Sequence, residues 1–363
     1  MTSLSRESIE NALKTYCDPH LDSDLVSAGA VQSIQIEDGR ASIEIILGFP
    51  ARGYIPQLVT TLTEKLRAVS GLEAVDIQVR TEITARAVQQ GQKPLPGIKN
   101  IIAVASGKGG VGKSTVAANL ALALSQEGAQ VGVLDADIYG PSIPRMLGVS
   151  GQPETKDGQL IEPKQSYDLQ IMSIGFLVEE DTPMIWRGPM ATSALQQLLT
   201  QTHWQDVDYL IVDLPPGTGD IQLTLTQQIP VSGALIVTTP QDIALLDAMK
   251  GLKMFEKVNV PVLGIVENMS LHICSQCGHE EPIFGSGGGG KLAEKYDVPL
   301  LGSLPLDISI RENADSGHPS VIYEPDSRIA QIYKEIARKA AAKLARRPKD
   351  FAAKFPKIVV END

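Results

Sequence analysis

Residues 106–115, SGKGGVGKST, have the residue types and spacing of a phosphate-binding loop. The segment 107–114 matches G-x-x-x-x-G-K-[ST], in which backbone N–H groups and a lysine surround nucleotide phosphates. An apolar run, IIAVAS, precedes the loop, and a helix-like segment, STVAANLALALS, follows it. This strand–loop–helix context is what the pattern requires, so the segment predicts a nucleotide site.

The residues of the loop have separable expected roles. Glycines allow backbone N–H groups to converge on phosphate oxygens, and the helix N-terminus adds its positive dipole end. Lys113 is expected to contact the β- and γ-phosphates of ATP, and the Ser114 hydroxyl to ligate Mg²⁺. The predicted nucleotide contacts in the loop are Gly107, Lys108, Gly109, Gly110, Val111, Gly112, Lys113, Ser114 and Thr115.

A nucleotide-hydrolysing site also needs carboxylates at neighbouring strand ends. Asp213 closes the apolar strand in DYLIVDLPPGTGD (208–220) and is expected to hold the magnesium through water. The loop 214–220 contains glycines and suits a switch that senses the γ-phosphate.

Two further acids, Asp135 and Asp137, end another apolar run in VLDADIYGPS. One of them can position the attacking water, because phosphoryl transfer depends mainly on positioning and charge neutralisation. The predicted function assigns this task to Asp137 and a contact in the nucleotide site to Asp135. The segment 137–142 is a second candidate switch loop. Asn268 ends a later strand, in ENMS, and is a candidate contact for the base.

Lys108 is a second lysine in the loop and comes too early in the bend to point easily into its own pocket. Such a residue can reach the phosphates of another chain, as an arginine finger supplied in trans does. This interpretation makes Lys108 a catalytic residue beside Lys113 and Asp137. It also predicts that nucleotide binding is coupled to formation of a homodimer.

Cys274 and Cys277 in HICSQCGH have the C-x-x-C spacing at which two thiolates can hold one metal centre. A [4Fe–4S] cluster needs four thiolates, and a two-fold dimer would supply them by bringing the same patch of two subunits together. The cysteine count and Lys108 therefore both indicate a homodimer.

Two other interpretations of this pair stay open. His272 and His279 complete H-x-C-x-x-C-x-H, which could offer Cys₂His₂ to zinc, although the one-residue gaps make a tetrahedral arrangement awkward. A redox C-x-x-C needs a helix N-terminus behind the first cysteine, and SQCGHEEPIFG is a poor helix start.

The elements that position these residues fall into four predicted parts. Residues 1–82 have an α-β-β-α-β pattern, with Asp38-Gly39 as a hairpin turn. Residues 83–98 are polar, contain two prolines and read as a linker. Residues 99–347 form the predicted P-loop ATPase domain, and residues 348–363 a basic tail.

Within 99–347, apolar runs alternate with helix-length segments such as 113–126 and 242–257. Strands that are apolar on both faces indicate a parallel sheet covered by helices on both sides. The fold class is therefore α/β, a doubly wound, mostly parallel sheet preceded by a small α/β domain. The last helix, about 326–346, carries alanines where a membrane-binding face needs large apolar residues, so we expect it to dock on the sheet.

Composition narrows the function classes. The 363 residues are 43% hydrophobic and 21% charged, with a formal charge of −11, which argues against a nucleic-acid partner. The sequence has no apolar run of membrane-spanning length and no signal-peptide pattern, so we expect a cytoplasmic protein without stable membrane association. Three cysteines cannot form a disulfide framework in a chain of this size.

The loop with its leading lysine resembles the deviant Walker A motif of the ParA/MinD class of dimeric ATPases. Within that class the chain resembles the Mrp (ApbC-type) iron–sulfur cluster carriers over about residues 98–325, through the motifs DADIYGPSIPRMLG, WRGPM, DYLIVDLPPGTGD, ENMS and the C-x-x-C. The resemblance implies a P-loop NTPase fold, ATP and Mg²⁺ at the loop, and Lys108 reaching across a homodimer. It also implies a [4Fe–4S] cluster bridging two subunits on Cys274 and Cys277. Many members have proline after the first cysteine, where this chain has Ser275.

Residues 1–82 resemble the small iron–sulfur-assembly (MIP-type) domain fused to bacterial members of that family. The cysteine that such domains often carry before a proline is absent from GFPARGY (48–54), and Cys17 lies elsewhere. We therefore expect this domain to dock other proteins and not to ligate a cluster. The expected partners of the whole chain are apo iron–sulfur client proteins and assembly factors.

The predicted function is a slow ATPase that carries an iron–sulfur cluster to apo-proteins. The alternative from another class is a ParA/MinD-like switch that recruits or positions partner proteins without a cluster. A third hypothesis, a small-molecule enzyme such as an ATP-dependent ligase, would require a pocket with convergent polar groups, and the sequence identifies none.

Overall fold

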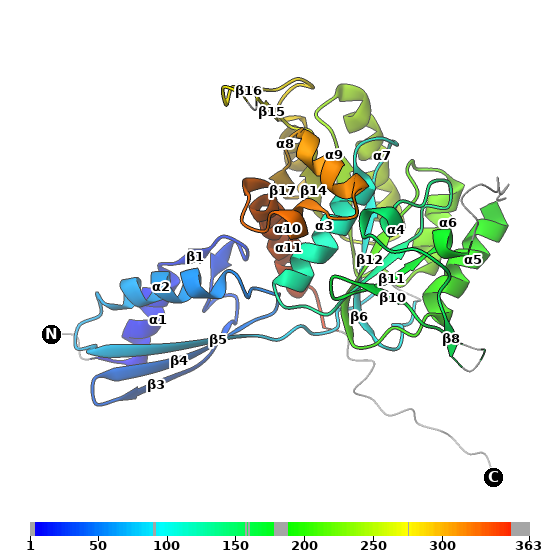
Figure 1. Cartoon of the computed structure of the whole chain (residues 1–363). Coiled ribbons are helices and arrows are strands. Elements are labelled where there is room, and N and C mark those ends of the chain that lie inside the picture. The colour runs from blue at the N-terminus through cyan, green and yellow to red at the C-terminus, as the bar shows by residue number, and fades with distance from the viewer. Residues whose placement is uncertain are drawn as a thin grey trace, which may run out of the picture.

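The computed structural model describes residues 4–89, 92–156, 158, 160–177, 188–274 and 276–349. These residues form a small N-terminal α/β unit and a large α/β unit built on an eight-stranded sheet (Figure 1). Trp186 and Arg187 of the WRGPM motif, Ser275, and the tail beyond Lys349 lie outside the described residues. No helix of the described part is both long enough and apolar enough to cross a membrane.

The small unit follows the predicted order of elements, with one short extra strand pair. Strands β3 and β4 are antiparallel, and the turn between them places Asp38 and Gly39 at φ 47° and 76°. Strand β5 pairs parallel to β4 after a crossover through α2, whose Leu58, Leu62 and Leu66 are buried. Its elements are α1 (Arg6–Lys14), β1 (Cys17–Asp18), β2 (Ser23–Asp24), β3 (Val31–Glu37), β4 (Arg40–Leu47), α2 (Ile55–Leu66) and β5 (Ala74–Thr81).

The large sheet has the doubly wound topology that the apolar runs predict. Its strand order is β10-β11-β7-β12-β6-β13-β14-β17, and every pairing except β10 with β11 is parallel. The strands are β6 (Ile98–Ala105), β7 (Val131–Asp135), β10 (Lys164–Ser166), β11 (Leu169–Ser173), β12 (Val207–Asp213), β13 (Gly233–Thr238), β14 (Val262–Glu267) and β17 (Leu300–Ser303).

Helices cover this sheet, and short strands lie in the loops that connect its elements (Figure 1). The helices are α3 (Lys113–Gln126), α4 (Ile143–Met146), the 3₁₀ turn η1 (Ile174–Phe176), α5 (Gly188–Gln201), α6 (Asp220–Gln228), α7 (Asp242–Lys257), α8 (Gly288–Tyr296), α9 (Ile308–Asp315), α10 (Ser320–Tyr323) and α11 (Arg328–Ala345). The short strands are β8 (Thr155–Lys156), β9 (Leu160–Ile161), β15 (His272–Ile273) and β16 (Glu280–Glu281). The predicted bounds of α3 and α7 agree with the observed ones, whereas β10 and β11 were not predicted.

The last helix, α11, docks on the large unit as expected. Ala340, Ala341 and Ala342 are fully buried, and the helix packs against α3 and β17. Small side chains allow this close packing.

The segment predicted as a linker is held against the large unit. The Gln89 side chain is buried; its amide donates to the Thr226 carbonyl (2.6 Å) and accepts from the Val231 N–H (3.3 Å). The Ala87 N–H donates to the Pro348 carbonyl (3.0 Å). These bonds fix the path between the two units, so polarity and prolines here mark an ordered connection.

A buried polar network joins the small unit to α3 and α11. His20 Nε2 lies 3.0 Å from the Glu335 carboxylate, and Glu335 also accepts from Arg338 (2.8 Å). Glu127, at the end of α3, lies 3.6 Å from Arg338 and accepts from the Gly53 N–H (2.9 Å). The two units are therefore positioned by charged groups as well as by apolar contact.

His20 is a titratable residue within this interface. Burial favours its neutral form, but Asp18 and Glu335 outweigh burial and raise the pKa of His20 above its usual value. The Tyr54 hydroxyl donates to Asp18 (2.8 Å), and hydrogen bonds from His20 and Tyr54 hold the pKa of Asp18 low although burial opposes them. The hydrogen bond from His20 lowers the pKa of Glu335.

These shifts predict the pH dependence of the free energy of unfolding. The His20 contribution is fully present below its unfolded pKa of about 6.5 and is lost as pH rises through the raised folded value. The contributions of Asp18 and Glu335 are present above their unfolded values and are lost as pH falls through their lowered folded values. His20→Gln should therefore destabilise the protein by about 1.5 kcal/mol near pH 6 and by less above pH 8. This value is at the low end for a hydrogen bond to a charged group, because Glu335 is half-exposed.

Urea unfolding between pH 5 and 9 measures this effect. His203→Gln is the matched control, because His203 also contacts a glutamate, Glu162, but is partly exposed and lies outside the interface. An equal loss for His20→Gln at every pH would show that His20 acts through packing and not through its charge.

Candidate nucleotide site and cysteine hairpin

The phosphate loop lies where the strand order of the sheet reverses. It follows β6, whose neighbours are β12 on one side and β13 on the other, and it leads into α3. Ligands of open α/β sheets bind at the carboxyl ends of strands at such a switch point. The switch segments 137–142 and 214–220 follow β7 and β12, the two strands next to β6 on one side, so the predicted parts of the site converge here.

Two glycines in the loop are required by the geometry. A Cβ at Gly107 would collide with the backbone of Asp247 and Ala248 in α7, so this residue allows the loop to lie directly on that helix. Gly112 has φ +83°, a conformation that favours glycine, and a Cβ there would meet the Asn268 amide.

Lys113 is buried and reaches the predicted carboxylates. Its Nζ lies 2.6 Å from Asp213 Oδ1 and 3.5 Å from Asp137 Oδ2, and it donates to the Ser114 hydroxyl (3.2 Å). The structure thus brings together four predicted site residues from three separate segments of the chain. Phosphate oxygens entering the loop would compete with these carboxylates for the lysine.

Burial makes the ionised forms of the acidic side chains in this site unfavourable. Burial raises the pKa of Asp135 to about 7, with Asp213 contributing, and burial also raises the pKa values of Asp137 and Asp213. When all three carboxylates are ionised, Lys113 compensates one of three negative charges. Asp213 Oδ2 is buried and has no hydrogen-bond partner among the described residues. A divalent cation carrying its own water molecules fits this charge deficit and this orphaned acceptor.

The two acids after β7 differ in what they contact. Asp135 accepts hydrogen bonds from the N–H groups of Asp137, Ser142 and Ile143 and from the Ser173 hydroxyl, at 3.0–3.2 Å. These hydrogen bonds occupy the carboxylate oxygens of Asp135 and hold the segment 137–142 in place. Asp137 faces Lys113 instead, which supports its predicted role, while a nucleotide contact by Asp135 stays a prediction.

Two neighbours brace the loop. The Asn268 amide donates to the Val111 carbonyl (2.9 Å), and the Gly217 N–H donates to the Ser106 carbonyl (2.9 Å). The second bond ties the segment 214–220 to the start of the phosphate loop. Asn268 thus supports the loop directly, and its contact with a base stays a prediction.

Lys108 differs from Lys113 in its exposure to solvent. It is exposed, whereas Lys113 is 5% exposed, and its carbonyl accepts from the Ser106 hydroxyl (2.9 Å). An exposed cation beside the phosphate loop is available to a second molecule, as the trans interpretation requires.

The cysteine pair lies on a projecting hairpin, β15–β16, seen at the top of Figure 1. Cys274 is partly exposed and Cys277 is exposed. The Cys274 N–H donates to the His279 carbonyl (2.9 Å), and the Gly278 N–H donates to the Cys274 carbonyl (2.8 Å), which closes a tight turn. Backbone N–H groups of Cys277 and Gln276 lower the pKa of the Cys274 thiol, which favours the metal-binding thiolate.

The geometry of this turn bears on the two alternatives. No three His, Cys, Asp or Glu side chains in the described ranges are grouped as a metal site, so His272 and His279 do not complete Cys₂His₂ with the thiols. The His272 ring instead donates from Nδ1 to the Leu306 carbonyl (3.1 Å). The pair lies between two short strands, and not at the helix start that a thioredoxin-type motif uses.

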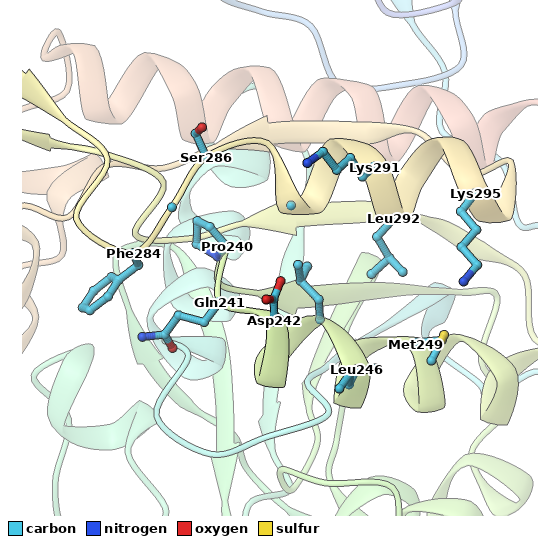
Figure 2. Close-up of a pocket in the computed structure, with 13 residues that line it drawn as sticks. Pro240, Gln241, Asp242, Leu246, Met249, Phe284, Ser286, Lys291, Leu292 and Lys295 are labelled. Atoms are coloured by element: carbon cyan, nitrogen blue, oxygen red, sulfur yellow. The ribbon is translucent and has the colours of Figure 1, made fainter.

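A groove of about 660 Å³ lies between α7 and α8, separate from the phosphate loop (Figure 2). Figure 2 shows apolar side chains on its walls, with Lys291 and Lys295 on the α8 side and Asp242 at the start of α7. This is not the set of convergent polar groups that the small-molecule enzyme hypothesis requires.

The glycine run 285–290 near this groove leads into α8, which begins at Gly288. The Gly289 N–H donates to the Glu267 carboxylate, so a protein carboxylate occupies the place of an anion at this helix end. A Cβ at Gly288 would collide with Leu245 and the Pro240 backbone. Close packing explains Gly288 and Gly289, where a Cβ would come too close to neighbouring atoms.

Sequence reasoning missed the residues that act on the site through other elements. Ser173 ends the unpredicted strand β11 and reaches Asp135, and Asp247 in α7 limits the residue type at Gly107. The sequence carries no local signal for either, because each contact joins segments far apart in the chain.

Two family models match this chain. Residues 97–341 match the model described as NUBPL iron-transfer P-loop NTPase, of the ParA group, and residues 6–79 match the model described as iron–sulfur cluster assembly protein. The boundary between the two matches falls in the segment that connects the small and large units.

Curated relatives match most of the chain. The iron–sulfur cluster carrier protein of Escherichia coli K12 is 52% identical over 340 residues, which cover 93% of this chain and 92% of that protein. The iron–sulfur cluster transfer protein NUBPL of Mus musculus is 52% identical over 273 residues, which cover 75% of this chain and 85% of that protein.

Solved structures resemble the large unit. A nucleotide-binding protein from Archaeoglobus fulgidus in complex with ADP is 38% identical, with a TM-score of 0.57, and the match covers 64% of this chain and 90% of that one. The cell division ATPase MinD of Pyrococcus furiosus is 25% identical, with a TM-score of 0.50, and the match covers 66% of this chain and 97% of that one.

Proposed function

This chain belongs to the family of NUBPL-type iron-transfer P-loop NTPases, and from that premise we propose that it is an ATP-hydrolysing homodimer that carries an iron–sulfur cluster to apo-proteins. The observation that carries the proposal is the exposed dithiol hairpin on the same unit as a complete phosphate loop. Two thiols per chain suit a cluster shared by two subunits, since a [4Fe–4S] cluster takes four.

The proposed ATPase chemistry assigns a task to each residue of the site. Backbone N–H groups of residues 107–112 and Lys113 bind and orient the phosphates, and Asp137 holds the attacking water. Mg²⁺ held near Ser114 and Asp213 would neutralise phosphate charge. Lys108 of the second subunit would stabilise the charge that develops at the γ-phosphate.

The proposed coupling runs through the loops that follow β7 and β12. Asp135 anchors the segment 137–142, and the Gly217–Ser106 bond anchors the segment 214–220 to the phosphate loop. Loss of the γ-phosphate would change the contacts of both segments, and hence the subunit interface that holds the cluster. We propose slow turnover, because a partner that triggers this change would set its timing.

Transfer to a client tests the proposal. The protein is reconstituted anaerobically with iron and sulfide, repurified, and mixed with an apo-protein that gains enzymatic activity on receiving a [4Fe–4S] cluster. We expect absorption near 400 nm, about four irons per dimer, and activation of the client. A protein that stays colourless, or binds zinc in preference, would favour the alternative of a partner-positioning switch.

A further inference from the structure

A second cavity, of about 600 Å³, lies where the small unit meets the end of α11. The small unit contributes residues 27–30 and 46–48 to its walls, and residues 345–349 close the other side. The connecting segment contributes Thr84 and Arg86. Residues 106–115 do not line it, so this cavity is distinct from the nucleotide site.

The cavity concentrates positive charge on an acidic protein. Four cations line it, Arg86, Arg346, Arg347 and Lys349, although the whole chain carries a formal charge of −11. The carboxylate among its lining residues is Glu82, which lies 3.5 Å from Arg80. Clustered cations in a partly enclosed space attract anions more strongly than the same charges spread over a surface.

Arg86 is the most informative of these cations, because it is only 8% exposed. One of its guanidinium nitrogens donates to the Arg347 carbonyl (2.9 Å), and no ion pair joins it to an acid in the described part of the chain. Burial without a counter-charge lowers the pKa of Arg86. Buried arginines are normally paired, so an anion in the cavity would supply a counter-charge that the described residues do not.

Arg347 adds an independent observation. Its Nε is buried and lacks a hydrogen-bond partner among the described residues. A buried N–H without an acceptor costs about 1–3 kcal/mol, so an acceptor within reach of this group would be favourable. Arg86 thus lacks an ion pair and Arg347 lacks an acceptor for one buried donor, both among the described residues.

The surrounding backbone holds these side chains in place. Arg346 donates to the Leu21 carbonyl of the small unit (2.8 Å). The backbones of Arg86 and Lys349 form a β-bridge, next to the bond from the Ala87 N–H to the Pro348 carbonyl. The Arg86 and Arg346 side chains are thus positioned before any ligand arrives, which lowers the entropy cost of binding.

We propose that this cavity binds a small molecule with two or more phosphate or carboxylate groups. Planar guanidinium groups donate paired hydrogen bonds to such oxyanions, and four cations around one cavity suit more than one charged group. A bound anion would contact both units and would stabilise their docking.

Calorimetric titration of the full chain tests the proposal. Saturating Mg-ADP occupies the nucleotide site, so that added anions report on the second cavity. The probes are tricarballylate, fructose 1,6-bisphosphate and a short poly-glutamate peptide, and sodium chloride of equal ionic strength is the blank. We expect a dissociation constant of about 0.1 mM for at least one of the two small anions.

Substitutions locate the binding. The double variant Arg347→Gln/Lys349→Gln should weaken binding at least about tenfold, a loss typical of charged hydrogen bonds. Lys14→Gln/Lys343→Gln removes the same charge from exposed positions outside the cavity and should bind as the unsubstituted protein does. Arg86→Gln should also weaken binding, provided that its circular dichroism spectrum and unfolding midpoint show a folded protein.

Each outcome of the titrations either supports the proposal or overturns it. Binding of one small anion alone identifies a carboxylate or a phosphate ligand, and binding of both supports the shared chemistry. Heats equal to the chloride blank, or binding that survives Arg347→Gln/Lys349→Gln, would overturn the proposal. Binding of the peptide alone would replace the small molecule with an acidic partner protein. None of these results depends on whether the cysteine pair holds a cluster.

Discussion

Replacement of both hairpin cysteines, Cys274→Ser/Cys277→Ser, should abolish cluster binding and leave the fold and nucleotide binding intact. The unsubstituted protein should take up about four irons per dimer, and the double variant less than about a tenth of that, because a hydroxyl is a poor ligand for the iron of a cluster. Both thiols are on an exposed turn outside the core, so their removal should change the unfolding midpoint very little. Iron and sulfide analysis after anaerobic reconstitution, with ADP binding measured in parallel, checks the prediction.

Cys17→Ser is the matched control, because Cys17 is also an exposed free cysteine but lies in β1 of the small unit. It should retain full iron. Iron that is lost in Cys17→Ser but kept in the double variant would place the cluster on the small unit and contradict the proposed site. Each single variant, Cys274→Ser or Cys277→Ser, should lose most of its iron as well, since a shared cluster then has two of its four thiolates missing.

Lys108→Ala should lower ATP hydrolysis at least about 100-fold while ADP still binds. A cation supplied in trans to the γ-phosphate contributes a factor of about 10³–10⁵ in well-studied cases. Lys108 is exposed and has no contact with the buried carboxylates, so the loop and its Lys113 cluster should persist in the variant. Lys113→Ala, in contrast, should weaken nucleotide binding itself, because Lys113 faces the interior of its own loop.

Mixing two inactive variants tests whether Lys108 acts across the dimer. Asp137→Ala should be inactive because its site cannot position water. In a dimer of Lys108→Ala with Asp137→Ala, one site receives Lys108 from its partner and keeps its own Asp137. An equal mixture should recover about a quarter of full activity, since half of the dimers are mixed and each has one complete site.

The control mixture pairs Asp137→Ala with Lys113→Ala, in which both residues serve their own site, and it should stay inactive. If the Lys108 mixture also shows no recovery, although co-purification of two differently tagged variants demonstrates mixed dimers, Lys108 acts within its own chain. The homodimer would then have to be argued from the cysteine pair alone.

The sequence by itself determined those parts of the protein in which the decisive residues are neighbours in the chain. The phosphate loop with its strand and helix, the Asp38–Gly39 hairpin and the bounds of α3 and α7 belong to this group, because strand pairing across a tight turn and helix periodicity are local. The apolar runs also predicted the parallel sheet, since strands buried on both faces leave that pattern in the sequence. Hence the fold class, the loop and the accessible cysteine pair could be predicted.

Only the tertiary structure decided how distant residues divide the work. Asp135 and Asp137 look equivalent in the sequence. In the structure, Asp135 accepts hydrogen bonds from Ser173 of β11 and from the backbone of residues 142–143, whereas Asp137 faces Lys113. The contact of His20 with Glu335, across 315 residues, and the burial of Arg86 without an ion pair to any described acid are likewise absent from any local pattern. Such contacts depend on which surfaces the folded units bury together, and burial is what shifts their pKa values and makes an unpaired charge costly.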